Sequence, residues 1–107
     1  MVTNILTASG IAYRRSRFVG KQPPTYAVYM DDVTAAGSDG AEALVLRHDI
    51  TIELYESKPN DAAEAAMEAA IEAAGFAWTK QDRYWLQTEQ LYQVIYEFTY
   101  YTKRRTH

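Results

Sequence analysis

The sequence predicts an α+β fold: a mainly antiparallel sheet of four to five strands, with a long helix at about residues 60–74 and a short N-terminal helix packed on one face. Residues 43–56 alternate apolar and polar side chains, as a half-buried strand does. Residues 60–74 instead repeat apolar side chains at helical spacing. Residues 91–101 alternate again and are rich in tyrosine. The expected order, α–β–β–β–α–β–β, is typical of helices on one face of an antiparallel sheet.

The composition indicates one small globular domain that spans residues 1–107. The 107 residues are 48% hydrophobic and 13% aromatic, which is enough for a single core. Because there is no cysteine, disulfides, thiolate nucleophiles and cysteine metal sites are excluded. No stretch approaches the ~20 apolar residues of a membrane span, and the N-terminus lacks the features of a signal peptide. We therefore expect a soluble intracellular protein.

The N-terminal segment predicts a short helix and then a short strand. The first ten residues place Ile5 and Leu6 on one helical side and end at Gly10, a residue type that commonly terminates helices. Residues 11–18 predict the strand. Pro23–Pro24 disfavours a helix and favours an extended entry into the next element.

A second strand and a loop are predicted next. Residues 26–33 alternate, with Tyr26 and Val28 on one side and Tyr29 on the other. Residues 34–42 contain two glycines together with serine and aspartate. This composition predicts a flexible loop.

The strand at residues 43–56 has the clearest pattern in the chain. Its even-numbered residues from 44 to 54 are apolar except for His48, so we expect one buried and one wet face. No nucleophile motif such as G-x-S-x-G accompanies His48. We therefore expect a hydrogen-bonded core or edge histidine rather than a catalytic base. The other histidine, His107, is the last residue and is expected to be mobile.

The long helix is defined by its caps and its apolar stripe. Asn60 and Asp61 are good N-cap residues, Asp61 with Glu64 fits a capping box, and Gly75 favours the left-handed conformation that ends a helix. The apolar stripe consists of Ala63, Met67, Ala70, Ile71 and Ala74. A second face carries a glutamate at every fourth position: Glu64, Glu68 and Glu72. We expect this second face to lie in solvent or against a basic partner.

The C-terminal part predicts a hairpin of two strands, residues 76–86 and 91–102. Most aromatic residues of the second strand are in phase with Val94: Tyr92, Tyr96, Phe98 and Tyr100. We expect this side to lie beneath the helices, so that the aromatic side chains pack in the core. A basic, flexible tail is predicted at about residues 102–107.

No pattern indicates an enzyme, a metal or a cofactor. Asp31, Asp32 and Asp39 lie around the predicted loop, but their spacing matches no EF-hand, and acidic loops are usually solvated. The three helix glutamates are expected on an exposed face, where burial cannot raise a pKa for acid–base catalysis. We expect no catalytic residue, no metal site and no cofactor.

Nucleic-acid binding is an alternative because sheets with surface aromatics and a basic tail stack bases in RNA-recognition folds. The phase of the aromatic residues places them on the covered side of the sheet. The other side offers Tyr55 and Tyr101 among acidic residues, which would repel phosphate. The acidic pI of about 5.3 also argues against binding to phosphate groups. A nucleic-acid-binding module is therefore the less favoured alternative.

Charge is distributed unevenly along the chain. Residues 31–72 hold eleven of the fourteen acids, whereas residues 1–30 hold four basic residues and no acid. The candidate basic side for a protein interface consists of Arg14, Arg15, Arg17, Lys103, Arg104 and Arg105. The candidate acidic side consists of Asp31, Asp32, Asp39, Glu64, Glu68 and Glu72. Such residues could pair within the chain or present opposite patches to other copies, and the sequence leaves both possibilities open.

Several segments together resemble a known family. They are ITIELYESKPN running into an acidic helix, then GFAW and TEQLYQVIYEF, with IAYRRSRFVGKQPPTYAVYM upstream. Over residues 5–101 the chain resembles the small tail-completion or tail-terminator proteins of the head–tail joining region of long-tailed bacteriophages and prophages.

The resemblance implies a non-enzymatic structural protein with an α+β fold. Tail terminators form a ring, usually hexameric, that caps the tail tube and docks it to the head. The implied partners are other copies of the chain, the tail tube protein and neck or connector proteins, first in the bacterial cytoplasm and then in the virion. A head-to-tail ring would let a basic edge meet an acidic edge. A head-completion or connector component of the same region remains the alternative.

Overall fold

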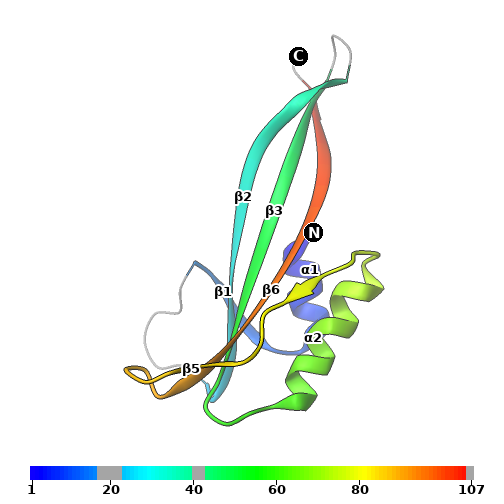
Figure 1. Cartoon of the computed structure of the whole chain (residues 1–107). Coiled ribbons are helices and arrows are strands. Elements are labelled where there is room, and N and C mark those ends of the chain that lie inside the picture. The colour runs from blue at the N-terminus through cyan, green and yellow to red at the C-terminus, as the bar shows by residue number, and fades with distance from the viewer. Residues whose placement is uncertain (17–22, 40–42, 106–107) are drawn as a thin grey trace.

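The protein is one sheet with two helices on one face, and the computed structural model describes residues 1–16, 23–39 and 43–105 (Figure 1). In chain order the elements are α1 (Val2–Ser9), β1 (Ala12–Arg15), β2 (Thr25–Asp39), β3 (Ala43–Glu56), α2 (Asp61–Ala73), β4 (Thr79–Lys80), β5 (Tyr84–Leu86) and β6 (Leu91–Arg105). The predicted α+β class is confirmed. Within the described part of the chain, neither helix is long and apolar enough to cross a membrane.

The sheet is larger and more mixed than predicted. In the part of the chain that the structure describes, it has six strands in the order β1-β2-β3-β6-β4, with β5 also paired to β6. β1 runs parallel to β2, whereas every other pair is antiparallel. Alternation of side chains reports which face is buried but carries no information on strand direction, so the parallel pair could not be predicted.

β2 and β6 continue through segments that the sequence predicts as loop and tail. β2 extends to Asp39 and takes up one extra residue in a bulge between Ala35 and Gly37. This corrects the predicted loop over residues 34–39, while residues 40–42 lie outside the described residues. β6 extends to Arg105, so residues 102–105 form a strand rather than a tail; residues 106–107 lie outside the described residues. Both corrections have one cause, because long-range pairing with β3 fixes segments whose own composition favours turns.

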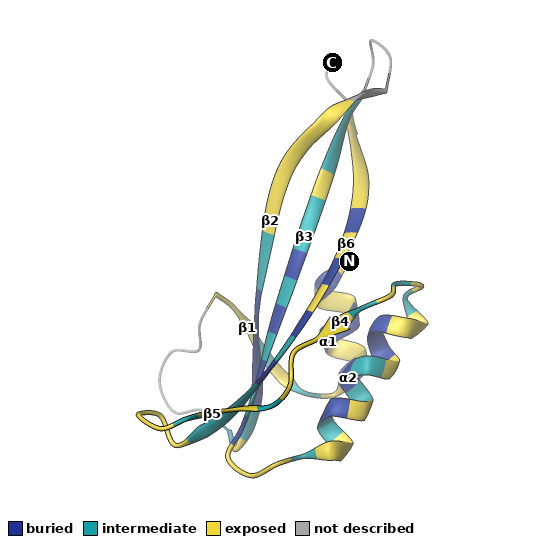
Figure 2. Cartoon of the chain, in the orientation of Figure 1, coloured by how far each residue is buried: buried dark blue, intermediate teal, exposed yellow. Residues whose placement is uncertain are grey.

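Three strands extend far beyond the helices and form what we call the arm: residues 33–39 of β2, 43–49 of β3 and 99–105 of β6 (Figure 1). The arm makes the molecule elongated, with extents of 51 × 27 × 21 Å. Figure 2 shows exposed residues along the outer strands of the arm and partly buried ones along β3 between them. Of the described arm residues, only Tyr100, at the base of the arm, belongs to the buried core.

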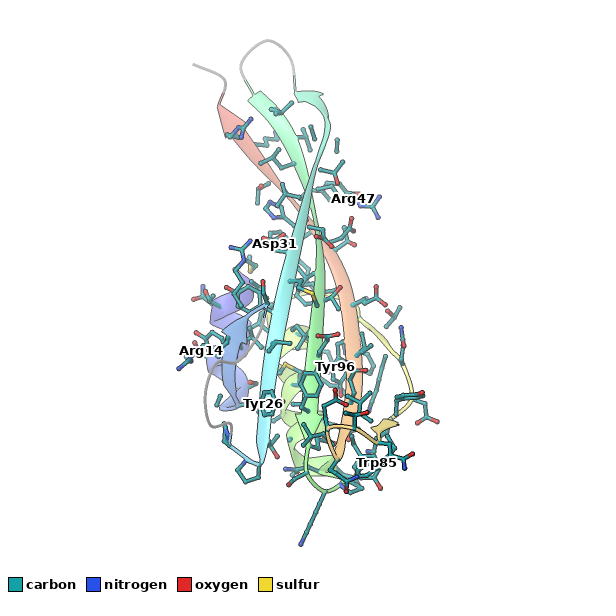
Figure 3. The ribbon with its side chains drawn as sticks, turned by 90° about the vertical axis from the view of Figure 1, so that its left-hand side faces the viewer. Arg14, Tyr26, Asp31, Arg47, Trp85 and Tyr96 are labelled. Carbon is teal, nitrogen blue, oxygen red and sulfur yellow. The ribbon has the colours of Figure 1, made fainter. Side chains whose placement is uncertain are left out.

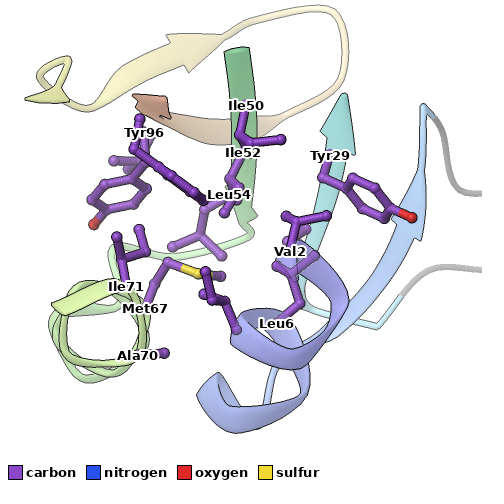
Figure 4. Close-up of a cluster of buried hydrophobic side chains, with 14 of the residues drawn as sticks. Val2, Leu6, Tyr29, Ile50, Ile52, Leu54, Met67, Ala70, Ile71 and Tyr96 are labelled. Carbon is purple, nitrogen blue, oxygen red and sulfur yellow. The ribbon is translucent and has the colours of Figure 1, made fainter. Parts of the chain in front are cut away.

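The core lies between the other end of the sheet and the two helices, which pack against each other (Figure 4). The predicted inner faces of β3 and β6 are confirmed there by Ile50, Ile52, Leu54, Val94, Tyr96, Phe98 and Tyr100. α1 contributes Val2, Ile5 and Leu6, and α2 contributes Met67, Ala70 and Ile71. Tyr96, Phe98 and Tyr100 are thus core residues, as their phase predicts. Tyr92, which was predicted on the same face, is only partly buried and lies against Trp85, with 4.8 Å between the ring centroids.

α2 begins at Asp61, one residue earlier than a capping box with Asp61 as its N-cap would require. The Asn60 side-chain oxygen accepts a hydrogen bond from the Ala63 backbone N–H at 3.0 Å, so Asn60 is the N-cap. The predicted pair of Asp61 and Glu64 is not a capping box, because Arg83 engages both carboxylates. The helix ends before Gly75, which has a φ of 91°.

Candidate assembly surfaces

A cluster of charged side chains joins α2 to the segment that contains β4 and β5. One Arg83 guanidinium nitrogen donates to Glu64 at 2.6 Å and to Asp61 at 2.8 Å. Lys80 forms ion pairs with Glu64 at 3.0 Å and with Glu68 at 2.7 Å. Glu64 is only 6% exposed, which corrects the predicted solvent exposure of this glutamate, whereas Glu72 is exposed as predicted. Glu64 is buried because both cations follow the helix in the chain and fold back over it.

The other two helix glutamates also bind donors from the same chain. The Tyr96 hydroxyl donates to Glu68 at 2.7 Å, and the Trp78 indole N–H donates to Glu72 at 2.9 Å. Burial first, and then this bond to Glu68, raises the pKa of Tyr96 well above its usual range. Glu64 and Glu68 therefore hold α2 to β6 and to the segment that follows the helix, whereas Glu72 stays exposed beside Trp78.

Glu56, at the end of β3, lies fully buried beside this cluster. Its nearest cation is Arg83, with 3.4 Å between Nε and Oε1. Among the described residues, neither Glu56 oxygen has a hydrogen-bond partner. Burial raises the pKa of Glu56 to about 7, and the neighbouring Glu64 carboxylate adds to the shift. Burial opposes ionisation of Glu64 as well, but hydrogen bonds from Arg83 and Lys80 outweigh it and hold the pKa of Glu64 below its usual range.

At the base of the arm, His48 of β3 forms hydrogen bonds to both neighbouring strands, β2 and β6. Its Nδ1 lies 3.1 Å from the Asp31 carboxylate, and its Nε2 lies 2.7 Å from the Thr102 hydroxyl. The ring stacks on Tyr100 with 4.5 Å between the centroids. In the tautomer that satisfies both contacts, Nδ1–H donates to Asp31 while Nε2 accepts from Thr102. The predicted hydrogen-bonded histidine is confirmed.

The predicted basic residues do not form one surface. Arg14 and Arg15 lie in β1, next to β2, whereas Lys103 and Arg104 lie on the arm part of β6. These two strands are on opposite sides of β3 in the sheet order. In Figure 3, Arg14 lies beside the helices, far below Arg47 on the arm. Arg17 is outside the described residues, and Arg105 is the last residue of β6.

The predicted acidic residues are also spread out. Asp31, Asp32 and Asp39 all belong to the extended strand β2 and do not converge around a loop. The helix glutamates lie elsewhere, in the cluster with Lys80 and Arg83. The three aspartates do lie on one strand, β2, which forms one edge of the arm.

The arm exposes two long strand edges that sequence reasoning missed. β1 pairs with β2 only over Tyr26–Tyr29, and β4 and β5 pair with β6 only over residues 91–97. Large apolar side chains stand exposed on both outer strands: Val33 is 50% exposed and Tyr101 is 59% exposed. Alternation could not reveal this, because it identifies faces and not edges.

The structure is that of an α+β protein whose sheet extends into a three-stranded arm. No family model matches the sequence, and no curated protein matches it. A solved structure with a similar fold is a chain of the virion of a native gene transfer agent particle. The TM-score is 0.66, and the match covers 94% of this chain and 84% of that chain at 16% sequence identity. At this identity the similarity establishes a common fold.

Proposed function

We propose that the chain is a non-enzymatic structural protein of a phage-like virion, acting in the head–tail joining region as a tail terminator or tail-completion protein. In this role, copies of the chain form a ring on the end of the tail tube and help to dock it to the head. The partners are the tube protein and neck or connector proteins. The protein would act in the bacterial cytoplasm during assembly and then remain in the virion.

The extent of the fold match carries this proposal. The similar chain is described as part of a virion, and the match spans nearly the whole of the present chain. The sequence resemblance over residues 5–101 independently points to the head–tail joining region. An elongated molecule with an arm of open strand edges suits a protein that works through contacts with neighbours.

A second candidate is a head-completion or connector component of the same region. The similar chain is described only as part of a virion, which suits either position. A nucleic-acid-binding module has less support, because Tyr96, Phe98 and Tyr100 are buried and cannot stack on bases.

Deletion of the gene from the phage or prophage that encodes the chain tests the proposal. For a tail terminator, electron microscopy should show heads detached from tails, with tails of abnormal and variable length because tube growth is not stopped. For a head-completion component, tails of normal length should accompany unjoined heads. Expression of the wild-type chain in trans should restore joined particles. Intact particles in normal number after deletion would refute both candidates.

A further inference from the structure

The directions of the backbone N–H and C=O groups along the two arm edges follow from hydrogen bonds made elsewhere on the same strands. The Tyr29 carbonyl accepts from the Ser16 N–H at 2.8 Å, on the side of β2 away from β3. In an antiparallel pair, the N–H and C=O of a residue point to the same side and successive residues alternate. Val33, four residues further on, therefore directs its N–H away from β3. On β6, the Ile95 carbonyl accepts a hydrogen bond from the Gln81 N–H at 2.9 Å, on the side of β6 away from β3. By the same alternation, the backbone N–H and C=O of Tyr101 also point away from β3.

These outward groups form two rows of hydrogen-bonding atoms with no strand beside them in the described part of the arm. An open edge of this length is a template for one more strand. Proteins usually blunt such an edge with a proline, a bulge, charged side chains, a short strand or a cover. On the arm, β2 has a bulge between Ala35 and Gly37 and β6 carries Lys103 and Arg104, so the unprotected part of each edge lies nearer the base, at residues 33–35 and 99–102. The described arm residues of β2 and β6 contain no proline, and each strand runs the full length of the arm.

The two edges carry opposite charge. Residues 30–39 of β2 include three aspartates and no basic residue: Asp31, Asp32 and Asp39. Residues 99–105 of β6 include three basic residues and no acid: Lys103, Arg104 and Arg105. Because the edges of one chain complement each other, the partner that fits each edge is a second copy of the chain.

The strand directions allow this pairing. β2 and β6 are both antiparallel to β3, so they run parallel to each other. A second copy shifted sideways in the plane of the sheet would bring its β2 edge alongside the β6 edge of the first. Thr34 and Tyr101 are both paired with Arg47, so they stand at the same height on the same face. In this register Asp31 and Asp32 are level with Phe98 and Thr99, closer to the base of the arm than Lys103 and Arg104, so the opposite charges attract along the edge rather than in direct pairs.

We propose that copies of this chain join head to tail through the arm, with the β2 edge of one copy paired in parallel with the β6 edge of the next. Each copy keeps one free edge of each kind, so the contact repeats until a ring closes. The inference rests on the self-assembly that the proposed function requires, and it names the surface responsible.

Thiol cross-linking tests the pairing directly, because the chain contains no cysteine of its own. Thr34→Cys and Tyr101→Cys are made in separate full-length chains, mixed at low salt and treated with a bismaleimide that tolerates a shift of two residues. Covalent dimers are expected in the mixture and not in either variant alone. The control pair is Ala65→Cys, at an exposed position of α2, with Tyr101→Cys. The yield of dimer from the arm pair should exceed that of the control pair by about tenfold or more.

Two outcomes overturn the proposal. Dimers in either single-variant sample would show that like edges pair, which is not a head-to-tail contact. A mixture with no more dimer than the control pair would show that the edges do not meet, since the reagent traps even short-lived contacts.

A proline variant tests whether backbone hydrogen bonds carry the contact. Val33→Pro removes an outward N–H, which an edge strand tolerates, whereas Val33→Ala keeps it. In the Thr34→Cys chain, the proline variant should lose the cross-link and the alanine variant should retain it, with both unfolding at temperatures close to that of the parent. Full cross-linking of a folded proline variant would contradict backbone pairing at this edge.

The arm contact and the virion role can fail separately. If the cross-link forms while gene deletion leaves particles intact, the arm pairs copies of the chain but the virion role is wrong. If deletion separates heads from tails while no cross-link forms, the virion role stands and the arm contact is wrong.

Discussion

Replacing Arg83 with alanine is expected to lower the midpoint of thermal unfolding by about 10–20 °C. Arg83 is the cation that lies between three carboxylates, those of Glu56, Glu64 and Asp61. Two of these carboxylates are almost wholly buried. Removing one partner of a buried ion pair leaves an uncompensated charge out of water, which destabilises a protein far more than the intact pair stabilises it. Differential scanning calorimetry at pH 8 measures the shift.

The matched control is Arg47→Ala. Arg47 also forms an ion pair, with 3.0 Å between its Nε and Asp49, but both side chains are well exposed. Exposed pairs contribute little, so the midpoint should change by no more than about 2–4 °C. Equal, small shifts for the two variants would show that the cluster on α2 is not what holds the helix to β4 and β5.

Glu56→Gln is expected to stabilise the protein at pH 8 by up to about 3 kcal/mol and to flatten its stability between about pH 4.5 and 7. Burial raises the pKa of Glu56 to about 7, so the folded state binds this proton more tightly than the unfolded state does. The contribution of Glu56 to the free energy of unfolding is therefore fully present below the pKa that Glu56 has in the unfolded chain. It is lost as the pH rises through about 7, the pKa of Glu56 in the folded protein. A glutamine is neutral throughout, and its amide can donate to Glu64.

Urea unfolding at pH 4.5, 6 and 8 measures this dependence. The parent chain should lose stability across the series while Glu56→Gln does not. Below pH 4.5 both should lose stability, because the pKa of Glu64 is lowered and its contribution disappears when it is protonated. Glu97→Gln, at an exposed position of β6, should keep the profile of the parent. A glutamine variant that still weakens from pH 4.5 to 8 would contradict the account of Glu56.

Local patterns predicted what depends on local chemistry. The alternation in β3 and β6 identified the core faces, and the caps and stripe of α2 placed the helix within a residue at either end. The N-terminal helix and its end at Gly10 also agree. In each case the side chains that decide the structure lie within a few residues of one another.

What the sequence did not predict depends on residues far apart in the chain. Glu64 is buried because Arg83, nineteen positions later, returns to it. Residues 34–39 and 102–105 are strands because β3 lies between them, although glycine, serine and charged residues favour turns. The open edges of the arm follow from the short reach of β1, β4 and β5, which no periodicity records.

The most direct test is cryo-electron microscopy of the head–tail junction in particles made by the phage or prophage that encodes the chain. We expect a ring of copies of this fold between head and tail tube, in which the β2 edge of each arm lies against the β6 edge of the next. A junction built without this chain would contradict the account.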